Sequence, residues 1–287
     1  MRIRIDHATT YSYDQAARFI IQVLRLTPRS CDGQQVERWR IETDVDARLR
    51  QSEDAFGNIV HTLYTEQPAD SLTVRVAGEV TTTDTGGVMS GWSERLSPLV
   101  FLRNTPLTTC DPALVDFTET FRDKSGLEQL HALMGALHQR ITFEVGVTSA
   151  THTAAQAFAE GRGVCQDHAH IFIAVARRLG VPARYVSGHM VRMDGETDQE
   201  AAHAWAEAHV EGLGWVGFDP ANGVSPSESY VRIASGPDYL GAAPVRGTSY
   251  GGGGERLSVK LDVRDVRQSQ GQQQAQQSGG RQTGWTR

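Results

Sequence analysis

The stretch that decides the fold is GRGVCQDHAHIFIAVARRLGVPARYVS, residues 161–187. Glycines precede Cys165, and apolar residues follow it at helical spacing until Gly180 and Pro182. A glycine just after the last periodic residue and a proline just beyond it are typical of a helix C-terminus. The pattern predicts a helix that begins at or near Cys165 and ends just before Gly180, followed by a strand that contains Arg184 and Tyr185.

A cysteine at that position has a chemical consequence. The first backbone N–H groups of a helix lack acceptors and its dipole is positive there, so the N-terminus favours a thiolate. The effect is about 0.3–1 kcal/mol, up to ~2 kcal/mol in a favourable geometry. This is too little to activate a thiol fully at neutral pH, so a second positive group is needed, and an imidazolium is the usual one.

The stretch AHAWAEAHVEGLGWVGFDP, residues 202–220, offers that imidazole. Alanines alternate with larger residues from His203 onwards, which predicts a strand whose small apolar face packs closely against a helix. The glycines at 212 and 214 predict a turn, and Pro220 ends the returning strand directly after Asp219. The result is a β-hairpin with His203 on one arm and Asp219 at the end of the other, in a register that the sequence leaves open.

These residues predict a Cys–His–Asp triad. Cys165 would be the nucleophile, His203 its thiolate partner and general base, and Asp219 the group that holds the imidazole in the correct tautomer. A competing hypothesis pairs Cys165 with His168, three residues later on the same helical face, as ligands of a metal in a hydrolase. His189 and His209 are expected at the surface or at the rim of the site, and Cys31 and Cys110 as buried small hydrophobes.

The rest of the chain divides into distinct units. Strict alternation over Ser71–Val80, with further short β segments at 36–43 and 59–65, predicts a β-sandwich with a scaffold or recognition role, since no cluster of titratable residues is visible there. Helices are predicted near 127–141 and 153–161. The predicted domains are a β-sandwich-like unit at 1–100, a catalytic core at 101–225, a C-terminal β extension at 226–266 and a disordered tail at 267–287.

Two low-complexity segments stand near the C-terminus. Gly251–Gly254 is a run of four glycines without a following Lys-Ser/Thr, which favours a flexible hinge over a phosphate-binding loop. From Gln268 to Gln277, seven of ten residues are glutamine, so no packed core is expected. These glutamines could be acyl donors for the protein's own site.

Composition narrows the function classes. The 287 residues carry a net charge of −6, which argues against a nucleic-acid binder that depends on phosphate contacts. Three widely spaced cysteines argue against a disulfide framework and favour a reducing compartment. Neither a signal peptide nor an apolar run long enough to span a membrane is visible. The expectation is a cytoplasmic protein without nucleic-acid or membrane partners; the oligomeric state cannot be read from the sequence.

Four motifs together resemble the transglutaminase-like superfamily: the Gly-x-Gly-Val-Cys-x-Asp helix start, the Gly-Val-Pro-Ala-Arg-Tyr-Val segment, the His-Ala-Trp strand and the Trp-x-x-x-Asp-Pro end. More narrowly, the chain is similar to bacterial members with an N-terminal β domain. The resemblance implies an α+β fold with a papain-like core and acyl transfer through a cysteine thioester. No cofactor is implied. The substrate would be a peptide or amide, such as a protein glutamine with a primary amine, and Asp167 and Trp205 are expected to contact it.

The resemblance leaves the activity open. The family includes transglutaminases, peptidases and amidases, and the motifs do not separate them. Members often supply a second oxyanion donor from a Trp or Tyr upstream of the cysteine, whereas residues 141–145 offer only Phe143. Losing one such donor costs roughly 10²–10³ in rate. A catalytically inactive binding module on the same fold is therefore an alternative to an enzyme.

Overall fold

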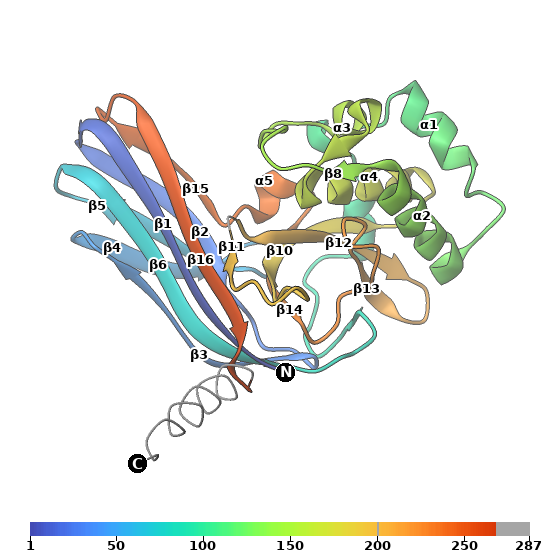
Figure 1. The fold of residues 1–287 in the computed structure, drawn as a ribbon, viewed down its shortest axis with the longest axis horizontal. Coiled ribbons are helices and arrows are strands. Elements are labelled where there is room, and N and C mark those ends of the chain that lie inside the picture. Colours follow the sequence, from blue (N-terminus) through green and yellow to red (C-terminus); the bar gives the residue numbers. More distant parts are fainter. Residues whose placement is uncertain (200, 268–287) are drawn as a thin grey trace, which may run out of the picture.

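The computed structural model describes residues 1–199 and 201–267, which form a strand-rich unit beside a unit with helices packed on a sheet (Figure 1). The strand-rich unit contains two antiparallel sheets. The first has the order β11 (Asp198–Gln199), β16 (Glu255–Asp265), β1 (Arg2–Ala17), β6 (Ala69–Thr82) and β3 (Gln34–Thr43). The second has the order β15 (Val245–Tyr250), β2 (Phe19–Thr27), β5 (Ile59–Thr65) and β4 (Ala47–Glu53).

The two sheets pack face to face through the buried side chains of their strands. Residues at every second position of β1, β2 and β6 are buried, as expected for strands with one face against a core. Leu24 and Leu63 of the second sheet pack in one cluster with Leu72, Val74 and Val76 of the first. The strand-rich N-terminal region predicted from the sequence is therefore confirmed.

The predicted C-terminal extension at 226–266 is not a separate unit. Strands β15 and β16 complete the two N-terminal sheets, where β16 pairs with β1 from Ile3↔Asp265 to Tyr13↔Glu255. The alternation of β16 is visible in the sequence, but its partner lies about 250 residues earlier in the chain, so pairing could not be read locally. The predicted disordered tail lies outside the described residues, apart from Arg267.

The glycine run at 251–254 makes a fixed connection rather than a hinge. It carries the chain from β15 in one sheet to β16 in the other, and the carbonyl groups of Gly252 and Gly254 accept hydrogen bonds from the N–H groups of Gln15 and Asp14. Gly251 has a φ of 86°, a conformation that favours glycine. The glycines are explained by this backbone geometry.

The second unit consists of one five-stranded sheet and the helices that pack on it. The sheet has the order β14 (Tyr230–Gly236), β10 (Ala183–Met190), β12 (His203–Val210), β13 (Gly214–Phe218) and β7 (Val88–Met89). Its helices are α1 (Pro112–Glu119), α2 (Gly126–Arg140), α3 (Ala154–Glu160), α4 (Cys165–Arg178) and α5 (Tyr239–Ala242). The remaining elements are the 3-10 helices η1 (Pro98–Leu102) and η2 (Pro106–Thr108) and the short parallel pair β8 (Thr142–Phe143) and β9 (Arg162–Gly163).

Helix α4 is the centre of this unit. Ala204, Ala206 and Ala208 of β12 are buried in the same cluster as Ala169 and Phe172 of α4, which confirms the predicted packing of a helix on the alanine face. The helix ends at Arg178, and Gly180 follows with a φ of 85°, as the sequence predicts. Because helix α4 is buried against the sheet, its first residue, Cys165, has a fixed position.

The opposite face of the sheet carries buried charge. Glu207 of β12 accepts hydrogen bonds from Arg184 of β10 at 2.6 Å and from Arg232 of β14 at 2.7 Å, and all three side chains are at most 8% exposed. The Arg184 guanidinium is therefore paired with a buried carboxylate. Removing one of these three side chains would be costly, because a buried charge would lose a partner.

The strand-rich unit also contains titratable groups that the sequence did not reveal. Glu79 of β6 is bound by Arg2, at 2.6 Å, and by Arg38. His7 of β1 is buried against His189 of β10, with ring centroids 5.5 Å apart. The second contact joins the two units.

Among the described residues, no helix is long and apolar enough to cross a membrane.

Candidate active site

Cys165 is the first residue of helix α4, and the residues before it explain the Gly-x-Gly motif. Gly161 ends α3 with a φ of 68°. Gly163 pairs with Phe143, and a Cβ atom at this position would lie 2.7 Å from the side chain of Asp167. Both glycines are therefore needed to bring the chain tightly from α3 into α4. The Cys165 N–H lies at the first helical position, where no intrahelical acceptor is available.

Asp167 holds this turn together from inside the protein. Its Oδ2 accepts hydrogen bonds from the N–H of Val164 at 2.8 Å and from the hydroxyl of Thr148 at 2.7 Å. Its Oδ1 lies 3.3 Å from Nδ1 of His152. The Asp167 side chain is buried, so these contacts make it a cap for helix α4. The expected contact of Asp167 with substrate stays a prediction.

The hairpin β12–β13 brings His203 and Asp219 together. Ala206 pairs with Phe218, so the same register places Asp219 opposite Trp205 and diagonal to His203. Nε2 of His203 is 2.6 Å from Oδ2 of Asp219. This diagonal contact settles the register that the sequence left open. It also leaves Nδ1 as the ring nitrogen of His203 available to the sulfur of Cys165.

Two further side chains bind the Asp219 carboxylate. Oδ2 also accepts hydrogen bonds from the amide of Asn222 at 2.7 Å and from the hydroxyl of Tyr230 at 2.8 Å. Oδ1 accepts the backbone N–H groups of Ala221 and Asn222. The Tyr230 ring packs against the imidazole of His203, with centroids 5.9 Å apart. These donors fix the carboxylate that orients the imidazole.

Electrostatics couple the three predicted triad residues. Burial opposes protonation of His203, but the Cys165 thiolate, a hydrogen bond to that side chain and the Asp219 carboxylate outweigh it and raise the pKa of His203 to about 10. Burial also opposes ionisation of Asp219, yet its hydrogen bonds from His203, Asn222 and Tyr230 hold the pKa of this carboxyl below its ordinary value. The structure thus favours a protonated His203 that lies between Cys165 and the Asp219 carboxylate.

Trp205 packs against His203 on the same face of β12. Its ring lies 6.2 Å from that of His203 and 5.4 Å from that of Tyr230, measured between centroids, and only 2% of the residue is exposed. The tryptophan therefore packs beneath the imidazole. Its expected contact with substrate stays a prediction.

Tyr230 and Asn222 were not identified from the sequence. Tyr230 lies in β14, which is separated from β13 by two strands, so no local pattern connects it to Asp219. Asn222 follows the Asp-Pro motif by two residues, and an amide at that spacing after a turn-forming Asp was the one signal available.

The two histidines expected at the surface, His189 and His209, both pack against other rings. His189 was expected at the surface or rim but is 2% exposed, because β10 runs through the middle of the sheet and its end packs against β1. His209 is half-buried against Trp215. Cys31, Cys110 and Cys165 are all free thiols, and each is half-buried rather than buried. Cys110 packs against the hydrophobic core, as expected of a small apolar residue.

His168 does not have the geometry of a metal ligand. Its Nδ1 lies 3.0 Å from the carbonyl oxygen of Val164, and its Nε2 lies 3.2 Å from that of Ile141. Neither ring nitrogen of His168 is therefore directed at a metal site that Cys165 could share. Within the described ranges there is also no group of three His, Cys, Asp or Glu side chains that could hold a metal ion.

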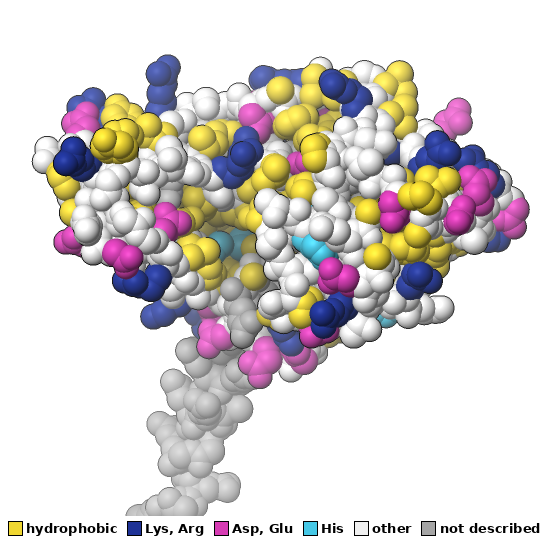
Figure 2. Space-filling view, turned by 90° about the horizontal axis from the view of Figure 1, so that it is seen from above, with side chains coloured by type: hydrophobic (Ala, Val, Ile, Leu, Met, Phe, Trp, Pro, Cys, Tyr) yellow, Lys and Arg dark blue, Asp and Glu magenta, His cyan; other side chains and the backbone are white. Residues whose placement is uncertain are grey.

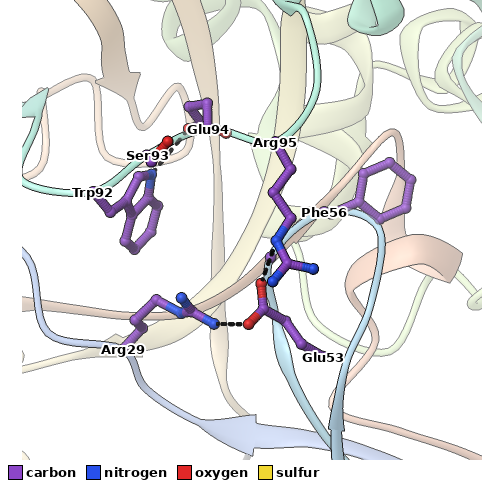
Figure 3. A pocket seen from close by; sticks show the side chains of 8 residues that line it. Arg29, Glu53, Phe56, Trp92, Ser93, Glu94 and Arg95 are labelled. Atoms are coloured by element: carbon purple, nitrogen blue, oxygen red, sulfur yellow. Dashed lines mark hydrogen bonds and ion pairs between the residues drawn. The ribbon is translucent and has the colours of Figure 1, made fainter.

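The surface between the two units is hollowed, and hydrophobic and histidine side chains are exposed in the hollow (Figure 2). A separate cavity of about 270 Å³ contains no triad residue. Arg29 and Arg95 converge there on Glu53, at 2.6 Å and 3.0 Å, while Trp92 donates to Glu94 (Figure 3). Because these carboxylates already have partners within the protein, the triad is the better candidate for chemistry.

Comparisons with known proteins identify the family of both regions of the chain. Residues 3–81 match the family model of the bacterial transglutaminase-like N-terminal region, and residues 115–220 match that of the transglutaminase-like superfamily. An uncharacterized protein of Mycobacterium leprae is 31% identical over 277 residues, which cover 91% of this chain and 98% of that protein.

Two further comparisons concern proteins with a named activity. A protein-glutamine gamma-glutamyltransferase of Pseudomonas aeruginosa is 30% identical over 144 residues, which cover 43% of this chain and 21% of that protein. The crystal structure of a proposed cysteine protease from Cytophaga hutchinsonii superposes with a TM-score of 0.73 at 19% identity, over 93% of this chain and 91% of that chain. The second likeness concerns the fold alone.

Proposed function

Because this chain belongs to the transglutaminase-like superfamily, we propose that it is a thiol acyltransferase in which Cys165 forms a thioester with the carbonyl carbon of an amide. The observation that carries the proposal is the 2.6 Å hydrogen bond between His203 and Asp219, in a hairpin whose imidazole is electrostatically coupled to Cys165 at the start of α4. A nucleophile, a base and an orienting carboxylate are the parts that this chemistry requires.

The first half-reaction follows from these positions. The Cys165 thiolate attacks the amide carbonyl, and the carbonyl oxygen becomes an oxyanion that the backbone N–H of Cys165 can bind. The imidazolium of His203 donates its proton to the leaving nitrogen, the C–N bond breaks, and ammonia or an amine departs. Asp219 keeps Nε2 of His203 protonated, so the proton that moves is the one on Nδ1.

The second half-reaction decides the class of enzyme. Neutral His203 removes a proton from the incoming nucleophile, which attacks the thioester and releases Cys165 as a thiolate. A primary amine gives a new amide and makes the protein a transglutaminase or amide ligase; water gives a carboxylic acid and makes it a peptidase or amidase. The partial identity to a protein-glutamine gamma-glutamyltransferase favours the amine.

The oxyanion site is the point at which this chain departs from its family. Phe143 lies beside Gly163, where the parallel pair β8–β9 brings residue 143 next to the Cys165 turn, and it carries no polar group. We therefore expect slow turnover, because one missing oxyanion donor costs roughly 10²–10³ in rate.

The test is a paired assay with glutamine-containing peptides. One arm follows incorporation of a labelled primary amine, and the other follows release of ammonia and carboxylate without the amine. We expect incorporation that disappears in Cys165→Ala and His203→Ala. Hydrolysis alone would reassign the protein as a peptidase or amidase. If neither product forms and Cys165 reacts with iodoacetamide no faster than Cys31 or Cys110, the fold serves as a binding module.

A further inference from the structure

The cavity of about 270 Å³ lies at the junction of the two units, and none of the triad residues lines it. One side of it comes from the strand-rich unit, through Arg29, which follows β2, and through Glu53 and Phe56 at the turn between β4 and β5. The other side is the segment 92–95, which leads from β7 to η1 in the second unit. A molecule bound in the cavity would therefore contact both units.

A closed ring of contacts holds the second side of the cavity on the sheet. Nε1 of Trp92 donates to Glu94 at 3.0 Å, and Glu94 also accepts a hydrogen bond from Arg184 at 2.8 Å. Arg184 in turn binds Glu207 at 2.6 Å. Arg232 binds the same Glu207 carboxylate at 2.7 Å, and its guanidinium carbon lies 4.5 Å from the centre of the Trp92 ring. The Trp92 wall of the cavity is therefore fixed before any ligand arrives.

This ring also balances its own charges, whereas the first side of the cavity does not. The two carboxylates of the ring lie against two guanidinium groups. On the first side, Arg29 and Arg95 converge on a single carboxylate, that of Glu53, at 2.6 Å and 3.0 Å. The neighbouring Asp54 is paired with Arg25. Among the described residues that line the cavity, one positive charge is thus left without a carboxylate.

The two arginines also have hydrogen-bonding capacity that the protein does not use. Nε of Arg29 is buried and has no acceptor among the described residues, a state that costs free energy. The side chain of Arg95 is 61% exposed, so its guanidinium is accessible from the solvent. A carboxylate is the ligand that matches guanidinium groups in both charge and geometry. The first side of the cavity therefore favours a carboxylate.

Aromatic rings complete the lining. Trp92 and Phe56 lie to either side of the ion pairs (Figure 3). The ring of Phe56 is backed by the buried Phe101, with centroids 5.8 Å apart. Aromatic faces pack well against flat apolar groups. The volume is slightly below the roughly 300–1,000 Å³ that is usual for ligand pockets, which favours a small molecule.

We propose that this cavity is a binding site for a small carboxylate that carries an aromatic group. The carboxylate binds to Arg29 and Arg95, and the aromatic group packs against Trp92. Glu53 competes with the ligand for the two arginines and so limits the affinity. The site is separate from the triad, and ligand binding there does not depend on the acyl-transfer reaction proposed above.

Calorimetric titration of the full chain with phenylacetate tests the chemical class. We expect saturable binding and a higher melting temperature, because the probe binds the folded state alone. Phenylacetamide has the same shape without the charge, and acetate has the charge without the ring. Each should bind at least about tenfold more weakly than phenylacetate. Equal affinity for phenylacetate and phenylacetamide, or no saturable binding of phenylacetate up to about 10 mM, would overturn the proposal.

Variants test the location. Arg95→Gln should weaken phenylacetate binding about tenfold or more, because a charged hydrogen bond is lost. Glu53→Gln should strengthen it about tenfold, because the competing carboxylate is removed. Arg48→Gln is the matched control: it removes an exposed arginine of β4 whose partner is Glu66 at the surface, so the affinity should stay within about twofold of wild type.

Thermal melts of the same variants separate binding from folding. Arg95 is largely exposed, so Arg95→Gln should melt within a few degrees of wild type, and its loss of affinity then reports on the site itself. Unchanged binding in Arg95→Gln would place the probe elsewhere and overturn the proposal. A Glu53→Gln variant that melts like wild type and binds phenylacetate more weakly would also overturn it, because the glutamate would then support binding rather than compete with it.

Discussion

The hydroxyl of Tyr230 donates a 2.8 Å hydrogen bond to Oδ2 of Asp219. Tyr230 comes from β14 and Asp219 follows β13, so the contact joins two distant strands of the sheet that carries His203. Both groups are buried. The bond therefore restrains the carboxylate that holds the imidazole of His203, and several expected outcomes depend on it.

Removing that hydroxyl should weaken catalysis more than folding. In Tyr230→Phe the ring that packs on His203 and Trp205 is kept, but Asp219 loses one donor. We expect kcat/KM to fall about 10- to 150-fold, the equivalent of the roughly 1.5–3 kcal/mol that one hydrogen bond to a charged group contributes. Steady-state kinetics beside a thermal melt would check this. A melt that drops while kcat/KM stays unchanged would show that the tyrosine serves only the core.

Asp167 should prove to be a helix cap. Asp167→Ala removes the acceptor of Val164 and Thr148, so we expect the free energy of unfolding to fall by about 1–3 kcal/mol and Cys165 alkylation to slow. Urea unfolding and iodoacetamide labelling measure the two effects. Asp111→Ala is a suitable control, because it removes the cap of α1 far along the chain from the nucleophile. A raised KM with unchanged stability would instead support the predicted contact with substrate.

The buried pair His7 and His189 should make the protein sensitive to acid. Burial lowers the pKa of His7 to about 4 and that of His189 to about 3. The folded state therefore holds both rings neutral, and their contribution to stability is complete above the ordinary value near 6.5 and is lost as the pH falls toward 4. His189→Phe, which cannot take up a proton, should lose less stability than wild type between pH 7 and pH 5. Equal slopes in urea melts would contradict this.

His203 should have the opposite pH dependence. Because its pKa is raised to about 10, the stability that it contributes is complete below about 6.5 and is lost as the pH rises through 10. We expect the free energy of unfolding of wild type to decline over this range. The decline should be smaller in Cys165→Ala, in which the thiolate partner is absent. Urea denaturation at pH 6.5, 8 and 9.5 would measure it, and identical profiles would argue against the ion pair.

The sequence was sufficient for those features that depend on neighbouring residues. The start of α4 at Cys165 follows from two glycines and an apolar period, and its end follows from Gly180. The hairpin follows from the alternation after His203 and from the glycines of its turn. Each of these signals acts over a few residues, through backbone conformation or the burial of one face, and is therefore present in the local pattern.

Contacts between distant segments were decided by the tertiary structure. The pairing of β16 with β1, the burial of His189 against His7 and the bond from Tyr230 to Asp219 each join residues that no periodicity connects. The carbonyls that surround His168 became visible only when α2 and α4 were packed together. Hydrophobic periodicity specifies which face of an element is buried, but not which partner covers it, because many partners bury the same area equally well.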